Sequence, residues 1–358
     1  MRRSTCLKVP NYQFWFGYVI PNAYLRLRTL AELSACTFVI VIKKKSIMRA
    51  IITTAYGSPE IFKVDNVAKP TAKPNELLIR IHASSVSKAD TMMRTGKPYI
   101  GRLVLGLTKP KNPIWGTGFA GVVEAVGSEV SKFKAGDKVF GENIDTMGTY
   151  AEYVTVSEDG IVAHLPKNLS FEAAAGMCDG GITSLNFLLN LGNIKPGQKV
   201  LINGASGSLG TAAVQIAKHF GAEVTGVCST KNVSLVYELG ADHVIDYTQH
   251  DFTENENSYD LIYDTVGVRS FAECCKALKE HGVYASPVLG MPLLGQMLVS
   301  SFIGTKRAKF SATGALPVKE TKRLMALLLE IIEAGNLIGV VDRSYSLEEI
   351  VDAHEYVD

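Results

Sequence analysis

Short hydrophobic segments separated by turn residues run through the chain from residue 48 onward. In the first part these segments are rich in β-branched residues and are bounded by Gly, Pro and Asn, a pattern typical of β-strands. Strands are predicted over residues 50–54, 76–83, 121–126, 137–140 and 150–156. The first part of the chain is therefore predicted to form a β-rich domain.

The hydrophobic pattern changes after Pro166. Residues 171–191 favour a helix, and residues 198–203 form a continuous apolar run suited to a strand buried on both faces. Four more strands are predicted, with helical segments between them, over residues 223–228, 243–245, 260–264 and 282–286. Strand alternating with helix predicts right-handed crossovers and a parallel sheet with helices on both faces. The expected fold class is α/β, with a doubly wound dinucleotide-binding domain.

A glycine-rich loop lies directly after the first of these buried strands. Ala205, Gly207 and Gly210 occupy the three small positions of a dinucleotide fingerprint, and the amphipathic helix that follows would point its N-terminal N–H groups at phosphates. Glycines often only turn a chain, but this position between buried strand and helix favours cofactor binding. The candidate cofactor-binding residues of the loop are Ala205, Ser206, Gly207, Ser208, Leu209 and Gly210.

The end of the second strand of this series indicates which cofactor is used. An Asp or Glu expected there in an NAD site is absent, and Ser229 and Lys231 lie in its place with no acid before Glu238. A hydroxyl and an ammonium would hold a 2′-phosphate by charge-assisted hydrogen bonds. NADPH is therefore predicted as the cofactor, and a solvated Lys231 is the alternative reading.

Composition and charge exclude several other classes of protein. The 358 residues are 47% hydrophobic and 20% charged, as in ordinary globular proteins, and the net charge of +2 gives no field that favours nucleic acid. The six cysteines show no C-x-x-C spacing, which argues against structural disulfides and zinc ribbons. We therefore expect a globular protein of a reducing, cytoplasmic compartment that does not bind nucleic acid.

Residues 1–47 do not follow the pattern of the rest. They hold eight basic residues and only one acidic residue, and their longest apolar run, Ala35–Ile42, is too short for a transmembrane helix. We interpret them as an upstream translation artefact or a disordered leader, with the working protein starting at Met48. An organelle address and a membrane-surface anchor are the alternatives.

Several motifs in order along the chain resemble the medium-chain dehydrogenase/reductase superfamily. The resemblance is greatest to its zinc-free quinone oxidoreductase (zeta-crystallin-like) branch, and it extends from Met48 almost to Asp358. The motifs that carry it are Val126-Gly127-Ser128-Glu129-Val130, Phe133-Lys134-Ala135-Gly136-Asp137-Lys138-Val139-Phe140-Gly141, Gly148-Thr149-Tyr150-Ala151-Glu152-Tyr153, the Gly204–Gly210 loop and Asp264-Thr265-Val266-Gly267.

The resemblance implies a catalytic domain interrupted by the cofactor domain. A GroES-like domain would cover residues 48–170 and be completed by residues 308–358, and a Rossmann NADP-binding domain would cover residues 171–307. Relatives usually continue past the position of Asp358 with a final strand, so the chain is expected to be truncated there. A homodimer is also implied by the resemblance.

Zinc-dependent alcohol dehydrogenases of this superfamily bind catalytic zinc through a Cys and a His-Glu pair. The corresponding positions here, residues 86–88 and 116–119, hold no such residues, and the four closely spaced cysteines of a structural zinc site are also absent. No metal site is therefore expected. Without a metal to stabilise an alkoxide, simple alcohols are poor substrates.

The resemblance then implies hydride transfer from NADPH to a quinone or an α,β-unsaturated carbonyl. Tyr56 matches an aromatic position near the active cleft and is a candidate proton donor or substrate contact, although it could equally pack at a strand end. The family pattern also assigns cofactor-side positions to Thr183, Tyr247, Asp264, Val266, Gly267 and Ser286.

Two other functions and the substrate remain open from the sequence. The branch also contains lens crystallins and vesicle-associated members, so a non-enzymatic NADPH binder is an alternative, and an enoyl reductase module or an alcohol dehydrogenase-like enzyme is a weaker one. Residues 95–115 and 290–310, which would line the substrate pocket, are apolar with interspersed basic residues. They favour a small hydrophobic, electrophilic substrate.

Overall fold

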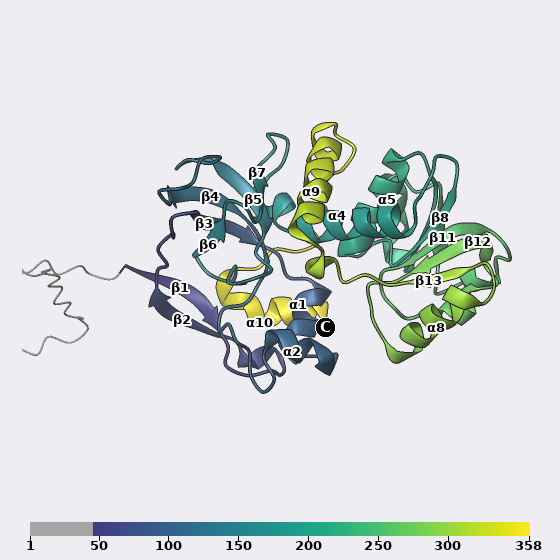
Figure 1. The fold of residues 1–358 in the computed structure, drawn as a ribbon, viewed down its shortest axis with the longest axis horizontal. Coiled ribbons are helices and arrows are strands. Elements are labelled where there is room, and N and C mark those ends of the chain that lie inside the picture. The colour runs from purple at the N-terminus through teal and green to yellow at the C-terminus, as the bar shows by residue number, and fades with distance from the viewer. Residues whose placement is uncertain (1–45) are drawn as a thin grey trace, which may run out of the picture. The chain divides into compact units, whose positions relative to one another are not determined.

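The computed structural model describes residues 46–358, of which Met48–Asp358 form one compact unit (Figure 1). The predicted leader, residues 1–47, falls almost entirely outside the described residues. No helix within residues 46–358 is both long and apolar enough to cross a membrane.

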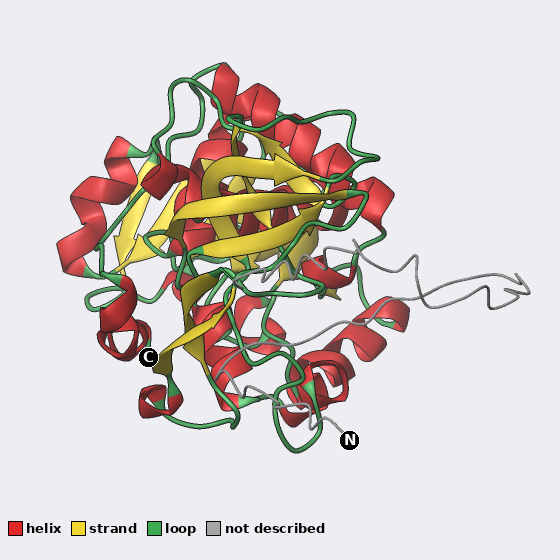
Figure 2. Cartoon of the chain, turned by 90° about the vertical axis from the view of Figure 1, so that its left-hand side faces the viewer, coloured by secondary structure: helices red, strands yellow, loops and turns green. Residues whose placement is uncertain are grey.

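An antiparallel five-stranded sheet forms the first half of this unit (Figure 2). The strand order is β6-β3-β4-β5-β7. Its strands are β3 (Glu76–Ser84), β4 (Gly118–Val126), β5 (Lys138–Glu142), β6 (Tyr153–Ser157) and β7 (Ile161–His164). The strand predicted over 150–156 begins three residues later, because Ala151 forms only an isolated bridge with Ala50. A separate pair, β1 (Ile47–Ile52) and β2 (Lys63–Ala68), lies outside this sheet.

Short helices and the end of the chain complete this half. Helices α1 (Lys88–Thr95) and α2 (Arg102–Leu105) follow β3, and α10 (Ile350–Val357) packs against α1. The guanidinium of the buried Arg94 in α1 forms an ion pair with the Asp358 carboxylate. The ring centres of His354 and Phe62 are 4.7 Å apart. The C-terminal residues therefore join the N-terminal half, as an interrupted domain requires. The boundaries proposed at 170/171 and 307/308 stay predictions.

The second half is a parallel six-stranded sheet with the order β10-β9-β8-β11-β12-β13. Its strands are β8 (Lys199–Asn203), β9 (Glu223–Cys228), β10 (His243–Asp246), β11 (Tyr259–Asp264), β12 (Leu278–Ala285) and β13 (Arg307–Lys309). The prediction of five strands is wrong by one. The missed strand, β13, has only three residues, two of them basic, so it carries no hydrophobic signal.

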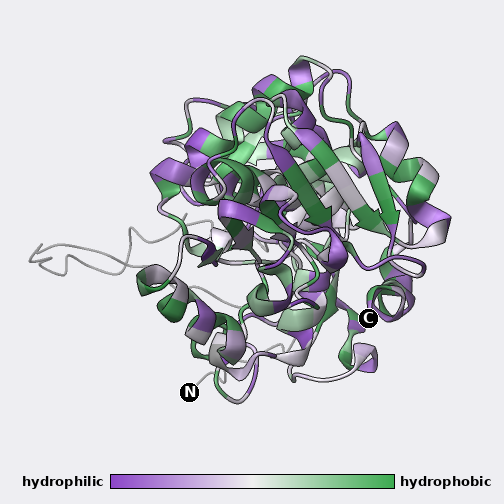
Figure 3. Cartoon of the chain, turned by 90° about the vertical axis from the view of Figure 1, so that its right-hand side faces the viewer, coloured by the Kyte–Doolittle hydropathy of each residue, from purple (hydrophilic) through white to green (hydrophobic). Residues whose placement is uncertain are grey.

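Both faces of the parallel sheet are covered, which explains the continuous apolar runs of its strands. In β8, Val200 and Ile202 enter the core beneath α4 and α5, whereas Leu201 enters the core on the opposite face. Figure 3 shows hydrophobic stretches along the strands of this half and hydrophilic positions on its outer helices. The helices are α4 (Met177–Leu185), α5 (Ser208–His219), α6 (Val233–Glu238), α7 (Phe271–Cys274), α8 (Met291–Phe302) and α9 (Val318–Glu333).

The long helix predicted over 171–191 is divided into three parts. Helix α3 (Phe171–Ala175) ends at Gly176, α4 follows, and residues Asn186–Leu191 form a wider π-helical turn. The hydrophobic pattern does not reveal these breaks, because residues 180–188, which span the change from α4 to the π-helical turn, are buried throughout and show no polar face. The observed GroES-like antiparallel half and parallel α/β half confirm the predicted fold class.

Candidate functional site

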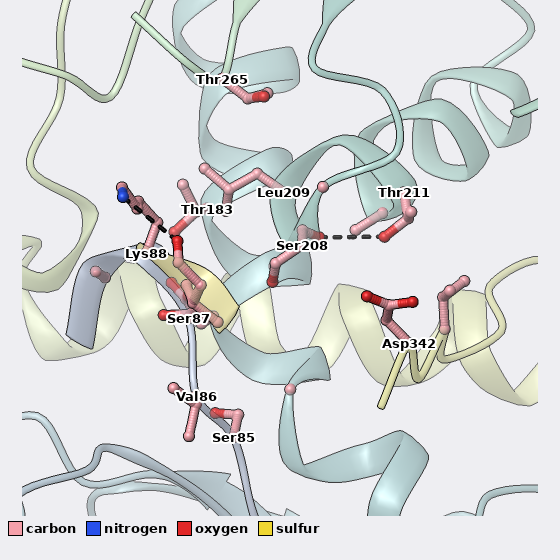
Figure 4. Close-up of a pocket in the computed structure, with 18 of the residues that line it drawn as sticks. Ser85, Val86, Ser87, Lys88, Thr183, Ser208, Leu209, Thr211, Thr265 and Asp342 are labelled. Atoms are coloured by element: carbon pink, nitrogen blue, oxygen red, sulfur yellow. Dashed lines mark hydrogen bonds between the residues drawn. The ribbon is translucent and has the colours of Figure 1, made fainter. Parts of the chain in front are cut away.

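A cleft of about 2080 Å³ lies at the carboxyl ends of the parallel strands, where they meet the antiparallel half. Its walls come from the connection after β3, the start of α4, the loop between β8 and α5, and residues 337–347 before α10. Figure 4 shows Ser87, Thr183, Ser208 and Asp342 around this space. Ligands of open α/β sheets bind at such strand ends.

The glycine loop has the geometry of a phosphate-binding turn. A β-carbon built on Gly210 would lie 2.1 Å from the carbonyl oxygen of Gly204, so this close packing of helix and strand requires glycine. Gly204 has a φ of +80°, a conformation that side chains disfavour. No side chain caps the N-terminus of α5, which begins at Ser208 on the cleft wall. Its first backbone N–H groups are therefore available to an anion.

The predicted cofactor residues divide into two groups in the structure. Those that line the cleft are Thr183, Ser206, Gly207, Ser208, Leu209, Ser229, Tyr247 and Val266. Those that do not line it are Ala205, Gly210, Lys231, Asp264, Gly267 and Ser286. Within the second group, Asp264 and Ser286 bond the backbone of loops beside the cleft, and Gly210 packs against Gly204.

Asp264 does not line the cleft but holds the backbone of one of its walls. It is fully buried, accepts a hydrogen bond from the Asn203 side chain at 2.9 Å, and also accepts backbone N–H bonds from Gly267 at 3.0 Å and Arg269 at 3.2 Å. The Tyr284 hydroxyl donates to it at 3.1 Å. Asp264 thus fixes the turn that carries Thr265 and Val266 onto the cleft wall.

At the end of β9 the polar groups that face the cleft are neutral. The Asn232 amide donates to the hydroxyls of Ser206 at 3.0 Å and Ser229 at 3.4 Å, and all three residues line the cleft. Lys231 is exposed and makes no side-chain hydrogen bond or ion pair within residues 46–358. The sequence pattern did not identify Asn232, although this residue directly follows Lys231.

Tyr56, the predicted proton donor, does not line the cleft. Its hydroxyl donates to the carbonyl oxygen of Gly106 at 2.6 Å, the Arg102 guanidinium lies 4.3 Å from its ring centre, and the ring meets Trp115 edge-on. This environment is that of a packed aromatic residue that contacts α2 and the residue that follows it. The prediction of a catalytic Tyr56 gains no support from these contacts.

Three carboxyl groups, those of Asp90, Glu142 and Asp179, lie near one another at the cleft. Burial raises the pKa of Asp90 to about 6, although hydrogen bonds from the Ser87 N–H and hydroxyl oppose the shift. Burial also raises the pKa of Asp179 and raises that of Glu142 well above its usual value, with further increases for Glu142 from the charges of Asp179 and Asp90. One sequence signal was available, because Asp179 is the only charged residue between Glu172 and Lys195.

One structural observation bears on metal binding. Within the part of the chain that the structure describes, no three His, Cys, Asp or Glu side chains gather as a metal-binding group. The positions that the family resemblance assigned to zinc ligands lie around Ser87 and Thr117 in this chain. Ser87 instead caps α1 through its hydrogen bonds with Asp90.

Comparison with known proteins places this fold and cleft in a family. Residues 73–167 match the alcohol dehydrogenase GroES-like domain, and residues 239–358 match the zinc-binding dehydrogenase family. The chain is 33% identical to a quinone oxidoreductase of Sus scrofa, over 87% of this chain and 94% of that protein. It is 32% identical to a 2-methylene-furan-3-one reductase of Solanum lycopersicum, over 96% of this chain and 84% of that protein.

A solved structure agrees with these matches. The quinone oxidoreductase of Escherichia coli complexed with NADPH superposes with a TM-score of 0.73 and 26% identity, covering 86% of this chain and 96% of that one. The similar proteins support an oxidoreductase that uses a nicotinamide cofactor. The chain therefore belongs to the medium-chain dehydrogenase/reductase superfamily and, within it, to the quinone oxidoreductase branch.

Proposed function

We propose that this protein is a zinc-independent, NADPH-dependent reductase of quinones and α,β-unsaturated carbonyls. The observation that carries the proposal is the uncapped N-terminus of α5 on the wall of a large cleft, preceded by a glycine loop too tight for side chains. The two relatives described above are named for a quinone and for an enone. Both are electrophiles that accept hydride without a metal.

The residues of the cleft fit a dinucleotide. The N–H groups at the start of α5 would bind the pyrophosphate, and Thr183 and Thr265 lie on the wall near them. When bound, the reduced nicotinamide supplies the hydride. The protein orients the two reactants and excludes water, since the rest of the wall includes apolar residues such as Met92, Val288 and Leu347.

The preference for NADPH over NADH rests on the group after β9. The hydroxyls of Ser206 and Ser229 and the amide of Asn232 can donate to a 2′-phosphate, and no carboxylate lies among them to repel it. Asp246, at the end of β10, is occupied by hydrogen bonds from Thr230 and Thr248 and does not line the cleft. Lys231 is the nearest cation along the chain to this group.

Zinc independence rests on the donor set of the cleft. Ser87 and Thr117 are poor ligands for Zn²⁺, which prefers thiolate, imidazole and carboxylate donors. Lewis-acid activation of an alcohol would need such donors near the hydride acceptor. An acceptor that is already electrophilic makes no such demand.

Steady-state oxidation of NADPH with a panel of quinones and enones tests the proposal. We expect turnover with members of both classes, activity that survives chelators, and weaker use of NADH. A protein that binds NADPH but turns over none of these acceptors would instead be a non-enzymatic NADPH binder. Loss of turnover on chelation, restored by added zinc, would contradict zinc independence.

A further inference from the structure

The proposed reaction consumes a proton as well as a hydride. Hydride transfer brings two electrons to the quinone or enone and leaves it as a hydroquinone anion or an enolate. An acid must then protonate the substrate oxygen. Tyr56, whose hydroxyl is bonded to Gly106, lies away from the cleft wall, so another group has to supply the proton.

Asp179 is placed to do so. It lies on the cleft wall in the first turn of α4, and Thr183, one turn later, lines the same wall. The next residue, Gly180, touches the glycine loop, because a β-carbon built there would lie 2.8 Å from the backbone oxygen of Ser208. Asp179 therefore lies beside the contact between α4 and the start of the helix that would hold the cofactor.

Burial favours the protonated form of Asp179, and a hydrogen bond from Thr183 opposes this rise in its pKa. The charge of Asp179 in turn raises the pKa values of its neighbours Glu142 on β5, Asp90 on α1, Tyr263 on β11 and Cys178 on α4. Two buried carboxyls beside one another hold a proton between them near neutral pH. Of Glu142 and Asp179, only Asp179 lines the cleft.

We propose that Asp179 is the catalytic acid that protonates the oxygen of the reduced substrate. The O–H bond of the Asp179 carboxyl breaks, an O–H bond forms on the substrate, and solvent returns a proton to the carboxylate. The reduced nicotinamide is oxidised and the substrate reduced by two electrons. This inference rests on the proposed function.

The variant Asp179→Asn tests the role directly. General acid catalysis contributes about 10²- to 10⁴-fold, so we expect kcat with a quinone or an enone to fall by at least a hundredfold. Affinity for NADPH should change by less than threefold. In the wild type, kcat should decrease at high pH as Asp179 loses its proton, and this decrease should be absent from the residual activity of Asp179→Asn.

Three further variants separate catalysis from structure. Asp342→Asn is the matched control, because Asp342 also lines the cleft but is exposed and accepts a hydrogen bond from Tyr356, and its pH profile should equal that of the wild type. Glu142→Gln removes the carboxyl with which Asp179 shares a proton, so the decrease in kcat should remain but move to lower pH. An Asp179→Glu variant should recover part of kcat together with the pH-dependent decrease.

An infrared spectrum of the cofactor-free protein gives a readout independent of turnover. At pH 7 we expect a protonated-carboxyl absorption that is smaller in Asp179→Asn than in the wild type and unchanged in Asp342→Asn. Retained kcat with an unchanged pH profile in Asp179→Asn, or an unchanged infrared band, would overturn the inference while the proposed function stands. A wild type that reduces neither quinones nor enones would overturn the proposed function and the catalytic role together.

Discussion

The two halves of the molecule differ in how their buried polar groups are satisfied. In the parallel half, Tyr263 is the only described residue with a buried side-chain atom that lacks a hydrogen bond. In the antiparallel half and the C-terminal helix that joins it, five residues have such atoms: Asp90, Arg94, Trp115, Tyr150 and His354. In the parallel half, called the cofactor half below, nearly all buried polar side-chain atoms are hydrogen-bonded. The antiparallel half with its C-terminal helix, called the catalytic half below, retains several buried polar groups with unused hydrogen-bonding capacity.

This difference follows from how each half is assembled. The loops of the parallel half are closed by nearby backbone groups, as when Gly207 donates to Gly204 at 3.0 Å. The catalytic half joins segments from opposite ends of the sequence, as in the contact of Arg94 with Asp358. Polar groups brought together from such distances are satisfied only in part, and unpaired groups beside a cleft are typical of functional sites.

Gly210→Ala should have the largest effect, because it disrupts the glycine loop of the cofactor half. The added β-carbon would lie 2.1 Å from the carbonyl oxygen of Gly204, so the loop must open and its N–H groups must move. We expect NADPH affinity, measured by calorimetry, to fall at least a hundredfold. Gly295→Ala in α8 is the control, because nothing lies within 4 Å of the added carbon, and it should gain about 1 kcal/mol of stability. Equal NADPH affinity of wild type and Gly210→Ala would contradict the phosphate-binding role.

His354→Phe should make the stability of the catalytic half less sensitive to acid. Burial lowers the pKa of His354 to about 4, so its neutral ring supports folding above pH 6.5 and that support is lost as the pH falls toward 4. Phe keeps the packing on Phe62 without the proton. Relative to wild type, the variant should gain on the order of 3 kcal/mol in free energy of unfolding between pH 6.5 and 4.

The pH profile of that variant should also expose an opposite contribution from Asp90. Its raised pKa of about 6 means that stability is lost as pH rises from about 4 through 6, which partly offsets His354 in the wild type. Denaturant unfolding across pH 4–8 measures both contributions. If stability depended on pH in the same way in wild type and His354→Phe, His354 would not titrate between pH 4 and 8. His219→Phe is the control, because His219 is exposed.

Arg94→Met tests whether the long-range ion pair holds the catalytic half together. The guanidinium is 1% exposed and also donates to the Gly57 carbonyl at 2.7 Å, whereas the Asp358 side chain is 40% exposed. Loss of fully buried pairs costs about 3 to 5 kcal/mol, so a half-exposed partner suggests about 2 kcal/mol here. Thermal unfolding should show a lower Tm with NADPH affinity unchanged. A matched loss of affinity would mean that the two halves are not independent.

Lys231→Ala has the smallest expected effect and sharpens the cofactor preference. Its ammonium is exposed, so its attraction for a 2′-phosphate is screened by salt, and we expect a loss of NADPH affinity of about tenfold with little change for NADH. Titrations of both cofactors at low and high salt measure this, with Lys319→Ala on α9 as the control. Equal losses for both cofactors would indicate that Lys231 supports the loop fold only.

The sequence by itself determined the features that depend on neighbours along the chain. The buried β8 run followed by Gly204–Gly210 and an amphipathic helix predicted the cofactor half, because each strand and turn there is specified locally. The chain motifs also predicted the GroES-like half through their order. Short or polar elements escaped detection, as β13 did, because three residues carry no periodicity.

Only the tertiary structure decided which polar residues share the cleft. It removed Tyr56 from the cleft wall, showed that Asn232 and not Lys231 bonds Ser206, and brought Asp179, Glu142 and Asp90 together from three separate elements. The shifted pKa values of Asp179, Glu142 and Asp90 arise from burial and from neighbouring charge, and both depend on distances in space that no local pattern encodes.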